Sequence, residues 1–110
     1  MRIVEKPWGF ELIWAETESY VGKLLHIDAK QRLSLQYHEI KEETVYVTQG
    51  TLLNYTDEES PPIHIPAGQS FHVKPNQVHR FGARDKFVEL VEVSTPHLND
   101  VVRLADDYKR

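Results

Sequence analysis

Short β-prone runs, none longer than eight residues, recur along this chain between residues that form turns. The breaks fall at Gly50 and at residues 57–62, 66–68 and 75–76. Turn signals spaced about every 8–12 residues are typical of an all-β sandwich or barrel. The strands that we expect are residues 10–14, 20–27, 33–38, 44–48, 52–55, 63–65, 70–73, 79–81 and 87–94.

The segment 99–108 is the one place where we expect a short helix, with Asn99 as N-cap and Asp100 in the first turn. An extended tail is the alternative. A chain of 110 residues has room for one domain, which we place at residues 1–110. Because nothing precedes residue 1 in the sequence, we expect no further domain ahead of it.

Composition limits the location and the partners of the chain. It has no cysteine, so any metal site must use nitrogen and oxygen ligands, and a reducing cytoplasm is the natural setting. The net charge is −4 without a long basic run, which argues against a nucleic-acid partner. Residues 1–10 do not form a signal peptide, and no run approaches the roughly 20 apolar residues of a membrane span.

The strand expected at residues 33–38 has an unusual pattern, because side chains alternate between the two faces of a strand. One face is apolar and carries Leu33, Leu35 and Tyr37, whereas the other is polar and carries Ser34, Gln36 and His38. A barrel with polar ligands in its interior turns the polar face inward. The apolar face then needs a cover, which is either another element of the chain or a second subunit, and for this reason we expect a homodimer.

Gln36 and His38 are followed after four residues by Glu43, and His79 comes later, eleven residues after Gly68. This spacing is similar to that of the metal ligands in cupins, and the resemblance implies a metal site. Two imidazoles, a carboxylate and an amide oxygen suit one borderline divalent cation. Zn²⁺ is our first choice, with Mn²⁺, Fe²⁺, Co²⁺ and Ni²⁺ as alternatives.

This spacing resembles the two motifs of cupins, which implies a single double-stranded β-helix, or jelly-roll barrel. The cupin pattern has Gly, His, Pro and Gly where this chain has Lys30, Gln36, Lys74 and Asn76. Asn76 is a mild change, since asparagine tolerates a left-handed backbone better than other non-glycine residues.

A closer resemblance is to the cupin domain of type II mannose-6-phosphate isomerases, the isomerase part of a bifunctional isomerase and guanylyltransferase. That family reads R-P-W-G, L-S-L-Q-x-H-H-H-R-A-E-H-W, I-E-V-Q and D-I-V-R-x-x-D-x-Y-G-R. The matching segments here are residues 6–9, 33–45, 91–94 and 100–110, in the same order. The resemblance implies metal-assisted aldose–ketose isomerisation of a sugar or sugar phosphate through a cis-enediol.

The resemblance also implies roles for individual residues. Lys41 matches the family's arginine and would stabilise the enediolate, although a solvated loop charge is the favoured alternative. Glu92 is a candidate acid or base, either inward-facing or an outward edge charge. Arg103 and Arg110 would hold a phosphate, whereas a structural role that ties the tail to the body through Asp106 and Asp107 is the favoured alternative.

Departures from the family pattern leave the substrate open. Glu39, Ile40 and Thr44 replace family histidines and make the rim less cationic. Two alternatives to the isomerase are a non-catalytic module that binds a sugar or another small molecule, and another metal-dependent cupin enzyme such as a dioxygenase. Three histidines, His26, His64 and His97, fit no motif, and His72 is a spare ligand candidate if its side chain reaches the interior. We expect Trp8 and Phe10 to share one face as a lid or dimer contact.

Overall fold

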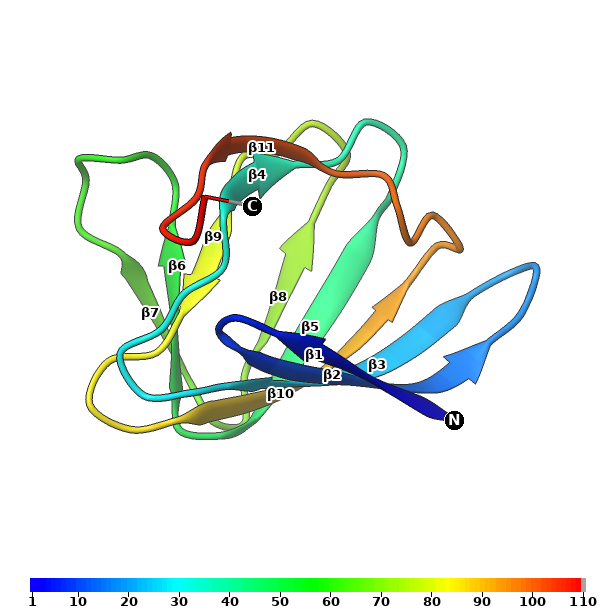
Figure 1. The fold of residues 1–110 in the computed structure, drawn as a ribbon, viewed down its shortest axis with the longest axis horizontal. Helices are drawn as coiled ribbons and strands as arrows, with labels where there is room; N and C mark the ends of the chain where they lie inside the picture. The colour runs from blue at the N-terminus through cyan, green and yellow to red at the C-terminus, as the bar shows by residue number, and fades with distance from the viewer. Residues whose placement is uncertain (110) are drawn as a thin grey trace.

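The computed structural model describes residues 1–109, which form β-strands, turns and loops without a helix (Figure 1). The all-β prediction is therefore confirmed. The strands are β1 (Arg2–Lys6), β2 (Gly9–Glu16), β3 (Val21–Ile27), β4 (Leu35–Tyr37), β5 (Glu43–Gln49), β6 (Thr51–Tyr55), β7 (Ile63–Pro66), β8 (Ser70–Val73), β9 (Arg80–Gly82), β10 (Val88–Ser94) and β11 (Val102–Ala105). Residues 1–109 contain no helix with the length and apolar composition that crossing a bilayer requires.

Two antiparallel layers face each other across the interior (Figure 1). One layer is a six-stranded sheet with the order β1-β2-β3-β10-β5-β8. The other combines β11-β4 with β7-β6-β9, and the bridges Gln36↔His79 and Arg32↔Gly82 join these two parts. A chain that passes repeatedly between two such layers forms a rolled barrel.

Alternation along the strands of the large sheet fills the interior with apolar side chains. Val45 and Val47 of β5 and Val88 and Leu90 of β10 are at most 1% exposed, and they point into the same space as Ile27 of β3. Each residue next to them in the sequence turns outward, as the period of two requires. The same alternation carries a few charged side chains inward, and these form the site described below.

Nine of the eleven strands overlap the segments predicted from the sequence, and β1 and β11 were missed. The helix expected over 99–108 is wrong, because β11 pairs with β4 through Val102↔Tyr37 and Arg103↔Gln36. Asp100 follows the turn at residues 98–99, and its carboxylate caps the loop of residues 39–41 instead of a helix. Pairing with a distant strand has overridden a local capping signal, as tertiary contacts often do.

The apolar face of the segment around β4 is largely covered within one chain. Leu33 belongs to the core cluster, and Leu35 is 5% exposed. The face that suggested a second subunit is therefore covered without one, and the homodimer stays a prediction.

Trp8 and Phe10 lie on opposite sides of the sheet, so the expectation that they share a face is wrong. Trp8 is 2% exposed within the core, whereas Phe10 stacks on His26. Gly9 between them has φ +151°, and a Cβ there would lie 1.9 Å from the carbonyl oxygen of His26. Only glycine fits this turn, which directs the indole inward.

Candidate metal centre

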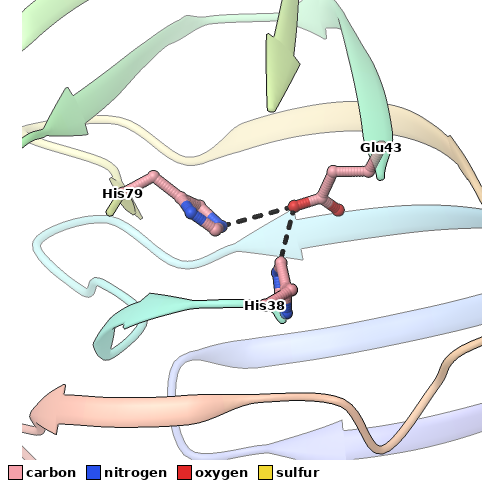
Figure 2. Close-up of side chains that lie close together, drawn as sticks. All are labelled: His38, Glu43 and His79. Carbon is pink, nitrogen blue, oxygen red and sulfur yellow. Dashed lines mark ion pairs between the residues drawn. The ribbon is translucent and has the colours of Figure 1, made fainter. Parts of the chain in front are cut away.

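Three buried side chains converge inside the barrel from separate segments (Figure 2). His38 follows β4, Glu43 begins β5, and His79 precedes β9. The Oε1 atom of Glu43 lies 3.4 Å from Nε2 of His38 and 3.3 Å from Nε2 of His79. The three residues are 3%, 3% and 1% exposed in the order His38, Glu43, His79, so water does not screen the group.

Main-chain pairing brings these segments together. Gln36 and His79 exchange two backbone hydrogen bonds of 2.9 Å, so their side chains leave the two segments on the same side. The backbone N–H of Asn76 donates to the backbone carbonyl of His38 at 2.6 Å. This hydrogen bond holds the turn before His79 against the end of β4. Asn76 takes the left-handed conformation, φ +64°, that its substitution for glycine predicts.

Both imidazoles are oriented from behind by main-chain oxygens. Nδ1 of His38 donates to the carbonyl of Asp100 at 2.5 Å, and Nδ1 of His79 donates to that of Gln77 at 3.0 Å. A hydrogen on each Nδ1 leaves the lone pair on Nε2, which faces Glu43. Such partners behind the ligand are typical of metal-binding histidines.

The donor set and its one orphaned atom fit a metal ion. Nε2 of His38 is buried and accepts no hydrogen bond among the described residues. A buried polar atom without a partner is costly, and a cation between the two imidazoles and the carboxylate would satisfy it. The His38, Glu43 and His79 group can therefore hold a metal ion, whose identity is open.

Gln36 lies in the same cavity as the three residues and has a partner of its own. Its Oε1 accepts a hydrogen bond of 2.6 Å from the hydroxyl of Ser34. A carbonyl oxygen has two lone pairs, so one remains for a further contact. The structure thus places Gln36 next to the group, and its role as fourth ligand stays a prediction.

Lys41 and Glu92 lie directly against Glu43. The Nζ atom of Lys41 is 3.4 Å from Oε2 of Glu43 and 3.2 Å from Oε2 of Glu92. Lys41 is 5% exposed and Glu92 3%. The favoured alternative for Lys41, a solvated loop charge, is wrong, because its loop folds inward. Of the two alternatives for Glu92, the inward one is correct, since it follows the buried Val88 and Leu90 on one face.

The pKa values of Lys41, Glu43 and Glu92 are shifted in different directions by burial and by one another. Burial alone would lower the pKa of Lys41, but the carboxylates of Glu92 and Glu43 outweigh it and raise that pKa above its ordinary value. Burial would raise the pKa of Glu43, yet the two imidazoles, Glu92 and Lys41 hold it well below its usual range. Burial and the charge of Glu43 raise the pKa of Glu92 to about 8. Of the two carboxyl groups, Glu43 is therefore the one held in its ionised form, whereas the pKa of Glu92 lies near neutrality.

The loop that carries Lys41 is fixed by the carboxylate of Asp100. Its oxygens accept the backbone N–H groups of Glu39 at 3.1 Å, Ile40 at 2.7 Å and Lys41 at 2.8 Å. These hydrogen bonds lower the pKa of Asp100 to about 2. Asp100 therefore holds the loop through its side chain and His38 through its main chain.

A second charged wall of the cavity was missed by the sequence analysis. Glu11 of β2 pairs with Lys23 of β3 at 2.8 Å and with Lys6 of β1 at 3.6 Å, and all three line the cavity. We call these three residues the lysine wall. Lys23 shares its face with Val21, Leu25 and Ile27, and a lone charge on an apolar strand face was the available signal.

The two arginines proposed for phosphate binding have different outcomes. Arg103 lines the cavity and is exposed, beside Gln36 in the β11–β4 pairing. Arg110 lies outside the described residues. Among residues 1–109, Asp107 is paired with Arg32 at 2.7 Å and with Arg80 at 2.9 Å, so arginines other than the expected ones tie down this part of the tail.

The comparisons with known proteins place this geometry in a family. Residues 1–106 match the family model described as the mannose-6-phosphate isomerase C-terminal domain. No curated protein sequence matches the chain.

Solved structures share the fold at low sequence identity. KdgF from Halomonas sp. is 18% identical with a TM-score of 0.74, covering 87% of this chain and 88% of that one. A cupin-like protein from Thermotoga maritima is 18% identical with a TM-score of 0.75, covering 88% and 76%. A sugar phosphate isomerase of the cupin superfamily from Silicibacter pomeroyi is 22% identical with a TM-score of 0.68, covering 78% and 58%. At these identities the likeness shows the cupin fold alone.

Proposed function

The chain belongs to the mannose-6-phosphate isomerase C-terminal family of cupins, and we propose that it is a metal-dependent aldose–ketose isomerase of a sugar phosphate. The observation that carries this proposal is the buried contact of Lys41 and Glu92 with the His38, Glu43 and His79 group. A cation site with an acid–base carboxyl group and a fixed ammonium beside it has the parts that enolisation next to a carbonyl needs. The homodimer and the cytoplasmic location remain predictions alongside it.

The residues that would hold the cation are His38, Glu43 and His79, with Gln36 as a fourth ligand. The bound ion, Zn²⁺ by preference, supplies Lewis acidity that polarises a carbonyl oxygen. Three or four protein ligands would leave room on such an ion for a substrate oxygen. Glu43 remains ionised in this arrangement, and the Nε2 atoms of both histidines point toward it.

Glu92 is the group that we assign to proton transfer between C1 and C2. A base works best with a pKa near the working pH, and burial raises the pKa of Glu92 toward that value. A divalent cation nearby would lower this pKa again and bring it closer to neutrality. Lys41 is held protonated by two carboxylates, and its ammonium can stabilise the negative charge of an enediolate.

The charge of the cavity favours an anionic substrate. Four cationic side chains line it, against three carboxylates, one of which is Glu92 with its raised pKa; the cations are Lys6, Lys23, Lys41 and Arg103. The chain as a whole carries a net charge of −4. A positive cavity in a negative protein attracts an anion to one place, and a bound cation strengthens this contrast.

Solvent exchange tests the isomerase directly. The metal-loaded protein is incubated in deuterated water with mannose 6-phosphate and a panel of other aldose phosphates. We expect deuterium at C1 or C2 of the product, because the proton passes through Glu92 and exchanges with solvent. Glu92→Gln should slow the reaction about 10²- to 10⁴-fold, the usual worth of a general acid or base.

The matched control is Glu89→Gln on the same strand. Glu89 faces outward and pairs with His26 at 2.7 Å, so its loss should leave the rate unchanged. If no aldose phosphate exchanges while the metal is bound, the isomerase is refuted. The non-catalytic binding module then becomes the better description.

A further inference from the structure

The segment that follows β10 crosses from the large sheet to the opposite layer and forms one wall of the cavity (Figure 1). We call residues 98–108 the strap. Three of its side chains, Leu98, Val101 and Arg103, line the cavity. None of residues 98–108 is fully buried, so contacts with neighbouring segments, more than core packing, hold the strap in place. A segment of this kind can open locally while the rest of the fold stays intact.

The front of the strap supports the metal centre through Asp100. Its main-chain carbonyl accepts the Nδ1–H of His38 at 2.5 Å, and its carboxylate accepts the backbone N–H groups of residues 39–41. Both contacts require a docked strap, because both come from a residue of the strap itself. Undocking therefore releases the imidazole of His38 and the loop that carries Lys41 at the same time.

The rear of the strap is fastened by Asp107, whose carboxylate two guanidinium groups share. Arg32 donates to it from Nε at 2.7 Å and from Nη2 at 3.1 Å, and Arg80 donates from Nη2 at 2.9 Å. We call Asp107, Arg32 and Arg80 the latch. Beside the latch, the hydroxyl of Tyr108 donates to Oε1 of Gln31 at 2.7 Å.

The latch favours the docked strap because Arg80 is a buried cation. Arg80 is 3% exposed, and its Nε donates to the carbonyl of Leu33 at 2.7 Å. Its carboxylate partner, Asp107, belongs to the strap. Undocking would leave the guanidinium inside the protein without this carboxylate, which is costly. Arg80 also follows His79 directly in the sequence, so the latch adjoins the second histidine of the metal centre.

A cation at the metal centre strengthens the front contact of the strap. When Nε2 of His38 binds a cation, electron density is drawn from the ring, and Nδ1–H becomes a stronger donor to the carbonyl of Asp100. A bound ion therefore favours the docked strap. Because such coupling is reciprocal, a docked strap raises the metal affinity by the same factor.

We propose that docking of the strap is coupled to metal binding, and that Asp107 is the positioning residue that sets the fraction of protein with a docked strap. The proposal rests on the metal-binding part of the proposed function and does not depend on the isomerase. The docked strap covers the metal centre, and it opens more often when the ion is absent. Opening removes Leu98 and Val101 from the cavity wall and lets a ligand enter.

Hydrogen exchange of the full chain with and without Zn²⁺ tests the coupling. We expect Zn²⁺ to slow exchange of the backbone amides of residues 39–41 and 102–105 about 10-fold, within the usual range of coupling between two sites. The amides of residues 59–60, which donate to the carboxylate of Asp57, should not change. Unchanged exchange in the strap overturns the proposal. Equal slowing in β6, whose amides report unfolding of the whole chain, also overturns it.

Asp107→Asn keeps the size of the side chain and removes its charge, which weakens the latch. In the metal-free variant, exchange of residues 102–105 should rise about 10-fold, and the Zn²⁺ affinity should fall about 5- to 10-fold. Saturating Zn²⁺ should restore slow exchange, because metal and latch act on one equilibrium. A merely structural loss is not recovered by metal, so unrestored exchange overturns the proposal. Asp85→Asn, on an exposed loop, is the control for the loss of one negative charge.

Arg32→Gln keeps the test valid if Asp107→Asn does not fold. It removes the hydrogen bonds of Arg32 to Asp107 and keeps the Arg80 pair, so both effects should appear at about 2- to 5-fold. Faster strap exchange with unchanged Zn²⁺ affinity overturns the coupling and leaves the metal centre standing. Failure of the unmodified protein to bind Zn²⁺ refutes the metal centre and the coupling together. Coupling in a protein that exchanges no sugar proton refutes the isomerase and supports the strap.

Discussion

The metal centre and the lysine wall face the same cavity but hold their side chains in different ways. The imidazoles of His38 and His79 are fixed by main-chain carbonyls, and backbone pairing joins their strands. Lys6 and Lys23 are held by a single carboxylate, that of Glu11. Ligands fixed by the backbone cannot turn without disrupting the sheet, whereas a lysine changes partner by rotating its own side chain.

This difference indicates a division of tasks within one cavity. A metal centre needs ligand atoms in place before the ion arrives, because geometry determines affinity. A wall that meets a flexible substrate gains from side chains that exchange an internal partner for the ligand. Changes at the metal centre should therefore affect stability through the metal, and changes at the lysine wall should affect ligand binding.

The largest expected effect comes from the metal itself. At about 100 times the dissociation constant, a ligand that binds only the native state adds about 2.7 kcal/mol to the free energy of unfolding. For a chain of this size each kcal/mol raises Tm by about 4–8 °C. We therefore expect Zn²⁺ to raise Tm by roughly 10–20 °C and a chelator to reverse the rise.

Glu43→Gln should abolish this rise, because an amide replaces the only carboxylate in the group. Glu42→Gln is the neighbouring control, since Glu42 is exposed and pairs with His72. Lys6→Gln should also retain the full rise, which separates the lysine wall from the metal centre. A melting curve indifferent to chelator, in protein shown by elemental analysis to carry metal, would contradict this account.

A smaller effect is expected from Asp100, which supports the metal centre from behind. Asp100→Ala removes the acceptor for three backbone N–H groups, so the loop of residues 39–41 loosens and His38 loses a well-placed carbonyl. Loss of such support usually weakens metal binding about 10- to 100-fold. Titration of Zn²⁺ against a competing chelator measures the change.

The control is a similar turn remote from the cavity. Asp57 accepts backbone N–H groups of Glu59 at 2.8 Å and of Ser60 at 2.6 Å. Asp57→Ala should disturb its own loop and leave metal affinity intact. Equal losses in both variants would mean that Asp100 acts on global stability and not on the metal centre.

The sequence predicted the metal centre better than the rest of the cavity, for a physical reason. His38, Glu43 and His79 come from segments whose spacing is set by hairpins and turns, which leave a mark in the sequence. Glu11 and Lys23 meet through pairing of β2 with β3, and Lys6 reaches them from β1, a strand that the pattern did not reveal. Ion pairs between separate strands leave no fixed spacing.

The end of the chain shows the opposite error. Asn99 and Asp100 have the composition of a helix start, and locally that interpretation was sound. The carboxylate does cap backbone N–H groups, but they belong to residues 39–41, about 60 positions earlier. The type of interaction was predictable from the residue, and its partner was not.

The smallest effect that we expect is a pH dependence of the support around the metal centre. Hydrogen bonds from residues 39–41 lower the pKa of Asp100 to about 2, below the value of about 4 that it has in an unfolded chain. A depressed pKa gives stability that is present above pH 4 and lost as the pH falls toward 2. Urea midpoints of the metal-free protein should therefore fall over this interval, and Asp100→Asn should make the fall shallower. An equally steep fall in the variant would show that other carboxylates carry the acid sensitivity, and that the Asp100 cap contributes little to folding.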